Sequence, residues 1–194
     1  MCEVDLIPGH IIPPGAQLPE GITSSELFLQ KVRTGFERKY PKGAKHREAG
    51  RIRLEKEIAI IMDLDIQDFF LVVNEVIEEA LRRGIRCLGR GSAANSIVTY
   101  LLDITRVCPV EHNLLFERFL HRGRKGTPDI DLDFDSSRRL EIIEWMEERF
   151  GAEHTGMAAT IDRYLTKSAV QDTAKALGWP AEMATQMSKR CSHA

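Results

Sequence analysis

Four aspartates occupy alternate positions of the segment 128–135, and this spacing is the strongest chemical signal in the chain. They are Asp129, Asp131, Asp133 and Asp135. On a β-strand side chains alternate between two faces, so the four carboxylates would share one face and the apolar residues between them the other. Neighbouring carboxylates would lie roughly 6.6 Å apart between Cα atoms, and their mutual repulsion favours bound cations. Because carboxylate oxygens suit divalent ions, the segment predicts a metal site.

Two other interpretations of the acidic segment are open. One is an edge strand with a solvated acidic face. The run of four acids and the bulky apolar residues on the other face argue against this interpretation. The other is a calcium loop of the EF-hand type. Counted from Asp129, such a loop needs glycine at position 6 and glutamate at position 12, where the sequence has Phe134 and Leu140. Moving the start to Asp131 or Asp133 does not restore the pattern.

A second chemical signal is the segment 89–96, GRGSAANS, which follows an expected strand at 85–88. A strand, two glycines and a helix N-terminus together present free backbone N–H groups to a phosphate. Gly91 would let the main chain come close, and Ser92 would add a hydroxyl donor. Arg90 would add a cation able to contact phosphate through two N–H groups. A tight turn with Ser92 as the helix N-cap is the alternative.

The same glycines fit a relaxed dinucleotide-binding pattern, from Gly89 to Ala94. A nicotinamide or flavin oxidoreductase would also need an acidic ribose ligand after a second strand, about 20 residues further on. That interval is expected to hold helix and loop, with Asp103 within it. The sequence therefore favours a triphosphate with metal ions over a dinucleotide.

Between the two motifs, residues 118–126 contain four cations and no acid. The cations are Arg118, Arg122, Arg124 and Lys125. A run of this kind is usually a solvated loop. Because it directly precedes the acidic segment, we interpret it as a contact to the phosphates of a polyanion whose metals the acidic strand would bind.

Composition adds broad limits. Hydrophobic residues make up 43% of the 194 positions, which is enough for a core, and the formal net charge of -2 does not by itself indicate a nucleic-acid-binding protein. The four cysteines show neither a C-x-x-C pair nor zinc-ligand spacing, so free thiols are expected. Neither a membrane-spanning apolar run nor a signal pattern is seen, so a cytoplasmic protein is expected.

The elements that would position the motifs alternate between helix and strand, which predicts an α/β (α+β) fold. Residues 1–22 are rich in proline and glycine and predict an extended lead-in. The first helix is expected after an N-cap at Ser24 or Ser25. Helices are expected over 26–40, 48–62, 74–83, 92–102, about 137–150 and 165–177. Strands are expected over 68–73, 85–88, 128–135 and 157–161.

With both motifs in view, the chain resembles the bacterial C-family DNA polymerases, which comprise the DNA polymerase III alpha subunit and its error-prone relatives. The likeness extends over about residues 25–180, where the motifs occur in the same order and at similar spacing. They are the segments 68–73, 89–96, 114–120, 128–134 and 167–178. The sequences of the GRGSAANS motif and of residues 166–170 are more similar to the error-prone branch of the family.

The resemblance implies a nucleotidyltransferase palm of the polymerase-β type, a mixed sheet with flanking helices that is incomplete here. Residues 1–22 would be an extended junction after a missing N-terminal domain, 23–162 the first part of the palm, and 163–194 the start of the thumb. It implies templated transfer of deoxynucleotides to a primer 3′-hydroxyl. The expected partners are primer–template DNA, deoxynucleoside triphosphates and, through missing regions, other replisome or mutasome subunits including a sliding clamp.

The resemblance also assigns residues. Gly91 and Ser92, with Arg90 beside them, would hold the triphosphate, and Arg118 is a further candidate for a phosphate contact. Asp129 and Asp131 would be the catalytic pair that binds two Mg²⁺ ions. Asp133 shares their face and is a supporting residue, because one branch of the family tolerates asparagine there.

Several departures from the family pattern are visible. The family's third metal-side carboxylate would lie beyond residue 194, and the fingers are missing. Cys108-Pro109 replaces the usual Asp-Pro. The missing third carboxylate and fingers motivate a second hypothesis from a different class, a catalytically silent module that binds a nucleotide or a partner. The isolated chain is expected to be inactive under either hypothesis.

Overall fold

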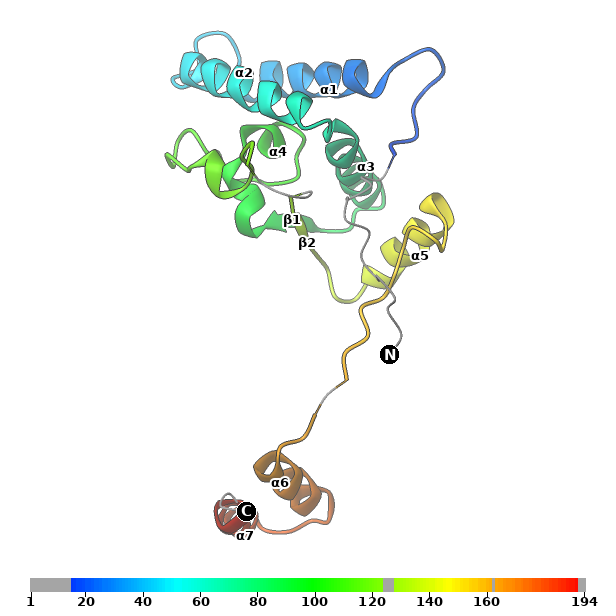
Figure 1. Cartoon of the computed structure of the whole chain (residues 1–194), viewed down its shortest axis with the longest axis vertical. Coiled ribbons are helices and arrows are strands. Elements are labelled where there is room, and N and C mark those ends of the chain that lie inside the picture. Colours follow the sequence, from blue (N-terminus) through cyan, green and yellow to red (C-terminus); the bar gives the residue numbers. More distant parts are fainter. Residues whose placement is uncertain (1–14, 124–127, 162, 192–194) are drawn as a thin grey trace. The chain divides into compact units, whose positions relative to one another are not determined.

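The structure is a computed structural model that describes residues 15–123, 128–161 and 163–191 (Figure 1). It divides into two compact units, the first ending at Thr155 and the second beginning at Gly156. Most of the expected lead-in, residues 1–14, lies outside the described part, as do residues 124–127, which include Arg124 and Lys125 of the cationic segment. The assignment of the chain to a junction, a palm and a thumb remains a prediction.

The first unit contains helices and one small sheet. Its helices are α1 (Ser24–Lys39), α2 (Arg47–Asp63), α3 (Gln67–Arg82), α4 (Ile97–Leu101) and α5 (Arg139–Phe150). Its 3₁₀ helices are η1 (Gly91–Asn95) and η2 (Phe116–Arg118), and its strands are β1 (Cys87–Arg90) and β2 (Asp131–Phe134). The expected helices 26–40 and 48–62 are confirmed within two residues at each end.

Helix α1 begins at a reciprocal cap. Thr23 Oγ1 accepts a hydrogen bond from the backbone N–H of Glu26, and the Glu26 carboxylate accepts one from the Thr23 N–H at 2.9 Å. This is the threonine version of the capping box, in which the side chain of a glutamate three residues later accepts a hydrogen bond from the backbone N–H of the cap residue. The expected cap at Ser24 or Ser25 was therefore wrong by one or two residues.

The expected strand at 68–73 was wrong, because this segment lies in the first half of α3. The apolar run is not a separate element, since buried positions continue at helical spacing to Ile77 and Ala80. Phe70 is completely buried, with its ring centroid 6.1 Å from those of both Phe28 and Phe119. Packing against residues distant in sequence thus overrides the strand propensity of the short segment.

The described residues form one two-stranded antiparallel sheet, in which β1 pairs with β2 (Figure 1). Together with the helices, this makes a helix-rich α+β arrangement. The larger mixed sheet that we expected is not seen in the described ranges, because 68–73 is helical and 157–161 has no regular structure. Met157 and Ile161 are strongly exposed, so no packing partner stabilises a strand there.

The core of the first unit forms where α1, α3 and α4 meet, and α2 packs against α4. Gly35 on α1 makes the approach to α4 possible, because a Cβ atom there would lie 2.3 Å from the carbonyl oxygen of Leu101. A similar close approach occurs at Gly89, whose N–H donates to the carbonyl oxygen of Ile104 at 2.7 Å. Strand β1 is thereby fixed to the end of the α4 segment.

The second unit is a pair of helices, α6 (Thr166–Ala176) and α7 (Ala181–Arg190), which pack against each other. The expected helix 165–177 is confirmed. Small buried residues, Ala174 and Ala184, lie between them. The connection turns at Gly178, which has a positive φ of 74°. In the ranges that the structure describes, no helix is long and apolar enough to cross a membrane.

Helices α3 and α5 are joined by a group of charged side chains. Glu79 on α3 accepts hydrogen bonds from Arg82 and Arg83, with its Oε1 at 2.6 Å from each guanidinium. Arg83 also reaches the backbone carbonyl of Glu141 on α5, and Arg138 donates to the carbonyl of Arg83 at 3.1 Å. The hydrogen bonds from the two arginines lower the pKa of Glu79 to about 2.

This lowered pKa predicts a specific loss of stability in acid. A carboxyl group whose folded pKa lies below its unfolded value stabilises the fold above the unfolded pKa and loses that contribution as pH falls. We therefore expect the urea midpoint of the chain to fall between pH 4.5 and about 2, and the fall to be smaller in Glu79→Gln. An equal fall in both proteins would contradict the assignment. Urea titrations at several pH values provide the measurement.

Candidate functional site

The pairing of β1 with β2 brings the two sequence motifs together. In the register of the sheet, Arg90 lies opposite Asp131. Gly91 follows directly, and a Cβ atom built on it would lie 3.2 Å from Asp131 Oδ2. The glycine-rich turn and the acidic strand, which are separated by about forty positions in the sequence, therefore form one site on one surface.

The alternation expected for the acidic segment is confirmed. Asp131 and Asp133 are exposed on β2, whereas Leu132 and Phe134 are half-buried and pack against the core. Asp129 is also exposed and precedes the strand. Strand β2 is shorter than the expected 128–135, but the separation of an anionic face from an apolar face holds.

Arg90 lies along this anionic face. Its Nε donates a hydrogen bond to Asp133 Oδ1 at 2.9 Å, and both side chains are about 60% exposed. This hydrogen bond, with the charges of Asp133 and Asp131, raises the pKa of Arg90. An exposed pair of this kind contributes little to stability, so its consequence is orientation of the guanidinium along the acidic strand.

The glycine-rich turn differs from the expected geometry. The single helix expected over 92–102 is split into η1 and the five-residue α4, with Ser96 in an extended conformation between them. Ser92 therefore lies in a 3₁₀ turn, and Ser96 is the N-cap of α4, accepting hydrogen bonds from Val98 and Thr99 N–H. The prediction that Ser92 opens an α-helix was wrong.

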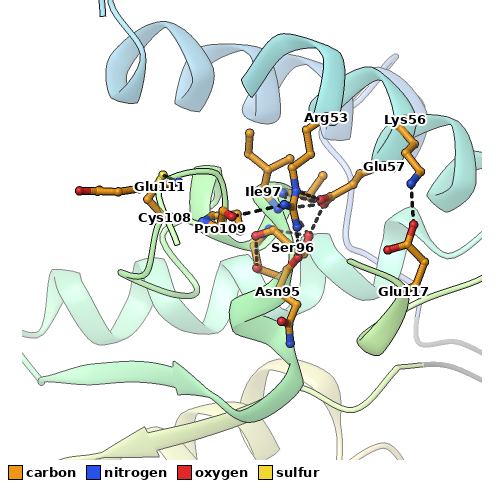
Figure 2. A network of polar contacts seen from close by, with 12 residues as sticks. Arg53, Lys56, Glu57, Asn95, Ser96, Ile97, Cys108, Pro109, Glu111 and Glu117 are labelled. Atoms are coloured by element: carbon orange, nitrogen blue, oxygen red, sulfur yellow. Dashed lines mark hydrogen bonds and ion pairs between the residues drawn. The ribbon is translucent and has the colours of Figure 1, made fainter. Parts of the chain in front are cut away.

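A buried ion pair that the sequence analysis missed lies behind this turn (Figure 2). Glu57 on α2 is completely buried, and its Oε1 accepts a hydrogen bond from Arg53 Nε at 2.9 Å. Its Oε2 accepts hydrogen bonds from Ser96 Oγ at 2.6 Å and from Ile97 N–H at 2.9 Å. Burial raises the pKa of Glu57, because desolvation disfavours its charged form, while these hydrogen bonds act in the opposite direction.

The sequence does contain a signal for Glu57. It is three residues after Leu54 and four before Ile61, and both of these are buried. A glutamate within a buried helical stripe must be paired, because burying an isolated charge is very unfavourable.

Arg118 is exposed at the end of η2, and η2 packs against η1. Arg118 is therefore carried by an element that touches the glycine-rich turn. Arg122 forms an ion pair with Asp63 at 3.0 Å, while Arg124 and Lys125 lie outside the described residues.

The chain was compared with known protein families and with individual proteins. The sequence profile of the family described as the bacterial DNA polymerase III alpha NTPase domain matches residues 26–194. The chain belongs to this family. It is similar to proteins named error-prone DNA polymerase, with 40% identity over 176 residues in Bdellovibrio bacteriovorus and 42% over 165 residues in Hahella chejuensis. The relative in Pseudomonas fluorescens is 37% identical over 192 residues.

These alignments cover most of the chain but little of the relatives. They include 91%, 85% and 99% of the chain for Bdellovibrio, Hahella and Pseudomonas, and 16%, 16% and 18% of the respective relative. The chain thus spans about a sixth of the length of the curated polymerases that it matches. Both motifs fall within the region matched by the family profile.

The carboxylates of this site are oxygen ligands of the type that a divalent cation takes. In the described ranges, no three histidine, cysteine, aspartate or glutamate side chains form a ready metal-binding group. Magnesium bound at nucleotide sites commonly takes one or two carboxylates and completes its coordination with phosphates and water. The exposed carboxylates of Asp129 and Asp131 provide such hard oxygens.

The contact between Gly91 and Asp131 leads to a prediction. Gly91 and Gly84 have the same φ of 68°, but a Cβ at Gly84 would meet no atom within 4 Å. We expect Gly84→Ala to destabilise the chain by about 1 kcal/mol through left-handed strain alone. We expect Gly91→Ala to destabilise it further, because its methyl group also displaces the Asp131 carboxylate. Urea unfolding measures both, and equal losses would show that the contact has no consequence.

Proposed function

We propose that the chain forms the nucleotide- and metal-binding part of a DNA-directed DNA polymerase, in a palm of the polymerase-β type. The polymerase would transfer deoxynucleotides to a primer 3′-hydroxyl, directed by a template, with two Mg²⁺ ions. The observation that carries this proposal is the position of Gly91 beside Asp131, which creates a phosphate-binding turn next to a carboxylate face. Membership of the bacterial DNA polymerase III alpha family supports it.

In this proposal the residues of the site divide into two groups. Asp129 and Asp131 hold the ions, which supply positive charge to the reacting phosphate and the 3′-oxygen. Gly91 and Ser92 approach the triphosphate through the main chain and the hydroxyl group. Arg90, which is oriented along β2 by Asp133, lies where it can bind the same phosphates. Positioning and charge stabilisation are the main demands of this kind of reaction.

The proposed reaction and partners follow from the same relatives. Several are named error-prone DNA polymerase, which favours a translesion role in DNA repair over bulk replication for this chain. The substrates would be primer–template DNA and deoxynucleoside triphosphates, and the setting would be the bacterial cytoplasm. Arg118, exposed near the glycine-rich turn, would contact phosphate. Contacts with a sliding clamp or other subunits would be made by regions outside this chain.

A second candidate function is a catalytically silent module that binds nucleotide without turning it over. The observation in its favour is that no group of three metal-binding side chains is formed in the described residues, so a third carboxylate would have to come from elsewhere. Both candidates predict nucleotide binding, and they differ in turnover.

The metal assignment predicts which carboxylates matter. We expect the chain to bind a fluorescent deoxyadenosine triphosphate more tightly with Mg²⁺ than without it. Asp129→Asn and Asp131→Asn should each remove most of the Mg²⁺-dependent part, about tenfold in dissociation constant, because a charged ligand is lost. Asp63→Asn, an exposed carboxylate on α2, is the matched control. Magnesium dependence that survives in both site variants would show that the metal ligands are misassigned.

Primer extension separates the two candidate functions. We expect no extension by the 194-residue chain alone, because it spans only about a sixth of the length of the polymerases that it matches. In a polymerase that includes this chain, we expect Asp129→Asn to abolish incorporation while the circular dichroism spectrum is unchanged. If the polymerase with intact aspartates also fails to extend a primer but binds nucleotide, the silent module is the better assignment.

A further inference from the structure

The turn that would bind the triphosphate is fixed at its far end by the buried pair Arg53 and Glu57 on α2. Directly after the turn, Glu57 accepts hydrogen bonds from the Ser96 side chain, through Oγ at 2.6 Å, and from the backbone N–H of Ile97 at 2.9 Å. Arg53 reaches the last residue of the turn, donating to the carbonyl oxygen of Asn95 at 2.6 Å. Figure 2 shows both side chains pointing from α2 into this segment.

The contacts continue from that end into the turn itself. Asn95 Nδ2 donates to the carbonyl oxygen of Ser92 at 3.0 Å, and Thr99 Oγ1 donates to that of Ala93 at 2.6 Å. Ala93 is completely buried, so the turn has a fixed inner side. A displacement of residues 95–97 would therefore be transmitted to Ser92.

Helix α2 is connected to the site by other contacts as well. Arg53 also donates to the carbonyl oxygen of Pro109 at 3.3 Å, and Lys56 forms an ion pair with Glu117 on η2 at 2.5 Å (Figure 2). Since η2 packs against η1, the helix supports the turn from two directions. Glu57 is nonetheless the member that is fully buried and makes hydrogen bonds to main-chain N–H at the start of α4.

A simple packing role would not require a charge at this place. A buried carboxylate is costly, and an apolar residue of similar size is often as stable or more stable. What a carboxylate offers is directional hydrogen bonding to several donors at once, which fixes the path of a loop. The opposite end of the turn is fixed separately, by the hydrogen bond from Gly89 to Ile104 and by the pairing of β1 with β2.

We infer that Glu57, assisted by Arg53, is a positioning residue that holds the Gly91–Asn95 turn in the conformation that receives a triphosphate. Glu57 itself does not touch the nucleotide; it acts through Ser96 and Asn95. This inference rests on the proposed function, because it assumes that the turn binds phosphate. According to this inference, the site formed by β1, η1 and β2 owes part of its affinity for the nucleotide to Glu57 on α2.

The test compares Glu57→Gln with Glu79→Gln in the 194-residue chain. Glu79 is a matched control because it too is a largely buried helical carboxylate that accepts hydrogen bonds from arginines, yet its partners are Arg82 and Arg83 at the end of α3. Both variants should lose stability. Binding of fluorescent deoxyadenosine triphosphate with Mg²⁺ should weaken about tenfold in Glu57→Gln, the scale of one lost charge-assisted hydrogen bond, and less than twofold in Glu79→Gln.

A second readout follows the turn itself. Amide hydrogen exchange at Ile97 and in the turn should be faster by about tenfold in Glu57→Gln, because its hydrogen-bonded opening becomes easier, and unchanged in Glu79→Gln. If Glu57→Gln does not fold, Ser96→Ala replaces it, since this variant removes the hydrogen bond from Ser96 to Glu57, together with the cap of α4, and keeps the ion pair. It should give a smaller change in the same direction in both readouts.

The outcomes separate this inference from the proposed function. Nucleotide affinity in folded Glu57→Gln within twofold of the unmodified chain, or equal weakening in Glu79→Gln, would overturn the positioning role. If the unmodified chain binds no nucleotide, the proposed function fails, and the exchange rates then decide whether Glu57 holds the turn. Unchanged exchange in Glu57→Gln would overturn that as well.

Discussion

The site depends on the antiparallel pairing of β1 with β2. A two-stranded sheet of four residues per strand is barely stable by itself, so it must be held by its surroundings. Gly89 provides this on one side, because its N–H bonds to the carbonyl oxygen of Ile104 where a side chain could not be accommodated. Leu132 and Phe134 provide it on the other, by packing against the core. Because the two strands are fixed in this register, Gly91 lies next to Asp131.

The two kinds of charge in this site have opposite environments. The aspartates of β2 are exposed, so water screens their mutual repulsion. Glu57 is buried, so it must be satisfied by the protein itself, and Arg53, Ser96 and the backbone of Ile97 do this. In the proposed function, the exposed face would accept a metal and a triphosphate with little rearrangement, and the buried pair would keep the neighbouring turn in one place.

The division of the 89–102 region shows how local patterns can indicate the right site and the wrong geometry. Glycines after a strand were interpreted as the opening of a helix, and the region does bring a turn to the acidic strand. The α-helix nevertheless starts at Ile97, because Ser96 and Glu57 satisfy its first N–H groups there. Gly91, with φ of 68°, begins a 3₁₀ turn instead. The positive end of α4 therefore points at a protein carboxylate, and in the proposed function the phosphates would be bound by the turn.

The sequence by itself determined the alternation of acidic and apolar residues on β2, the two long helices α1 and α2, and the family, because these follow from periodicity and motif order within short segments. Tertiary structure decided the rest. Residues 68–73 became helix because Phe70 packs between Phe28 and Phe119, which no window of neighbouring residues contains. The partnership of Glu57 with a turn about forty positions away arises in the same way, since burial and pairing depend on contacts that only the folded chain creates.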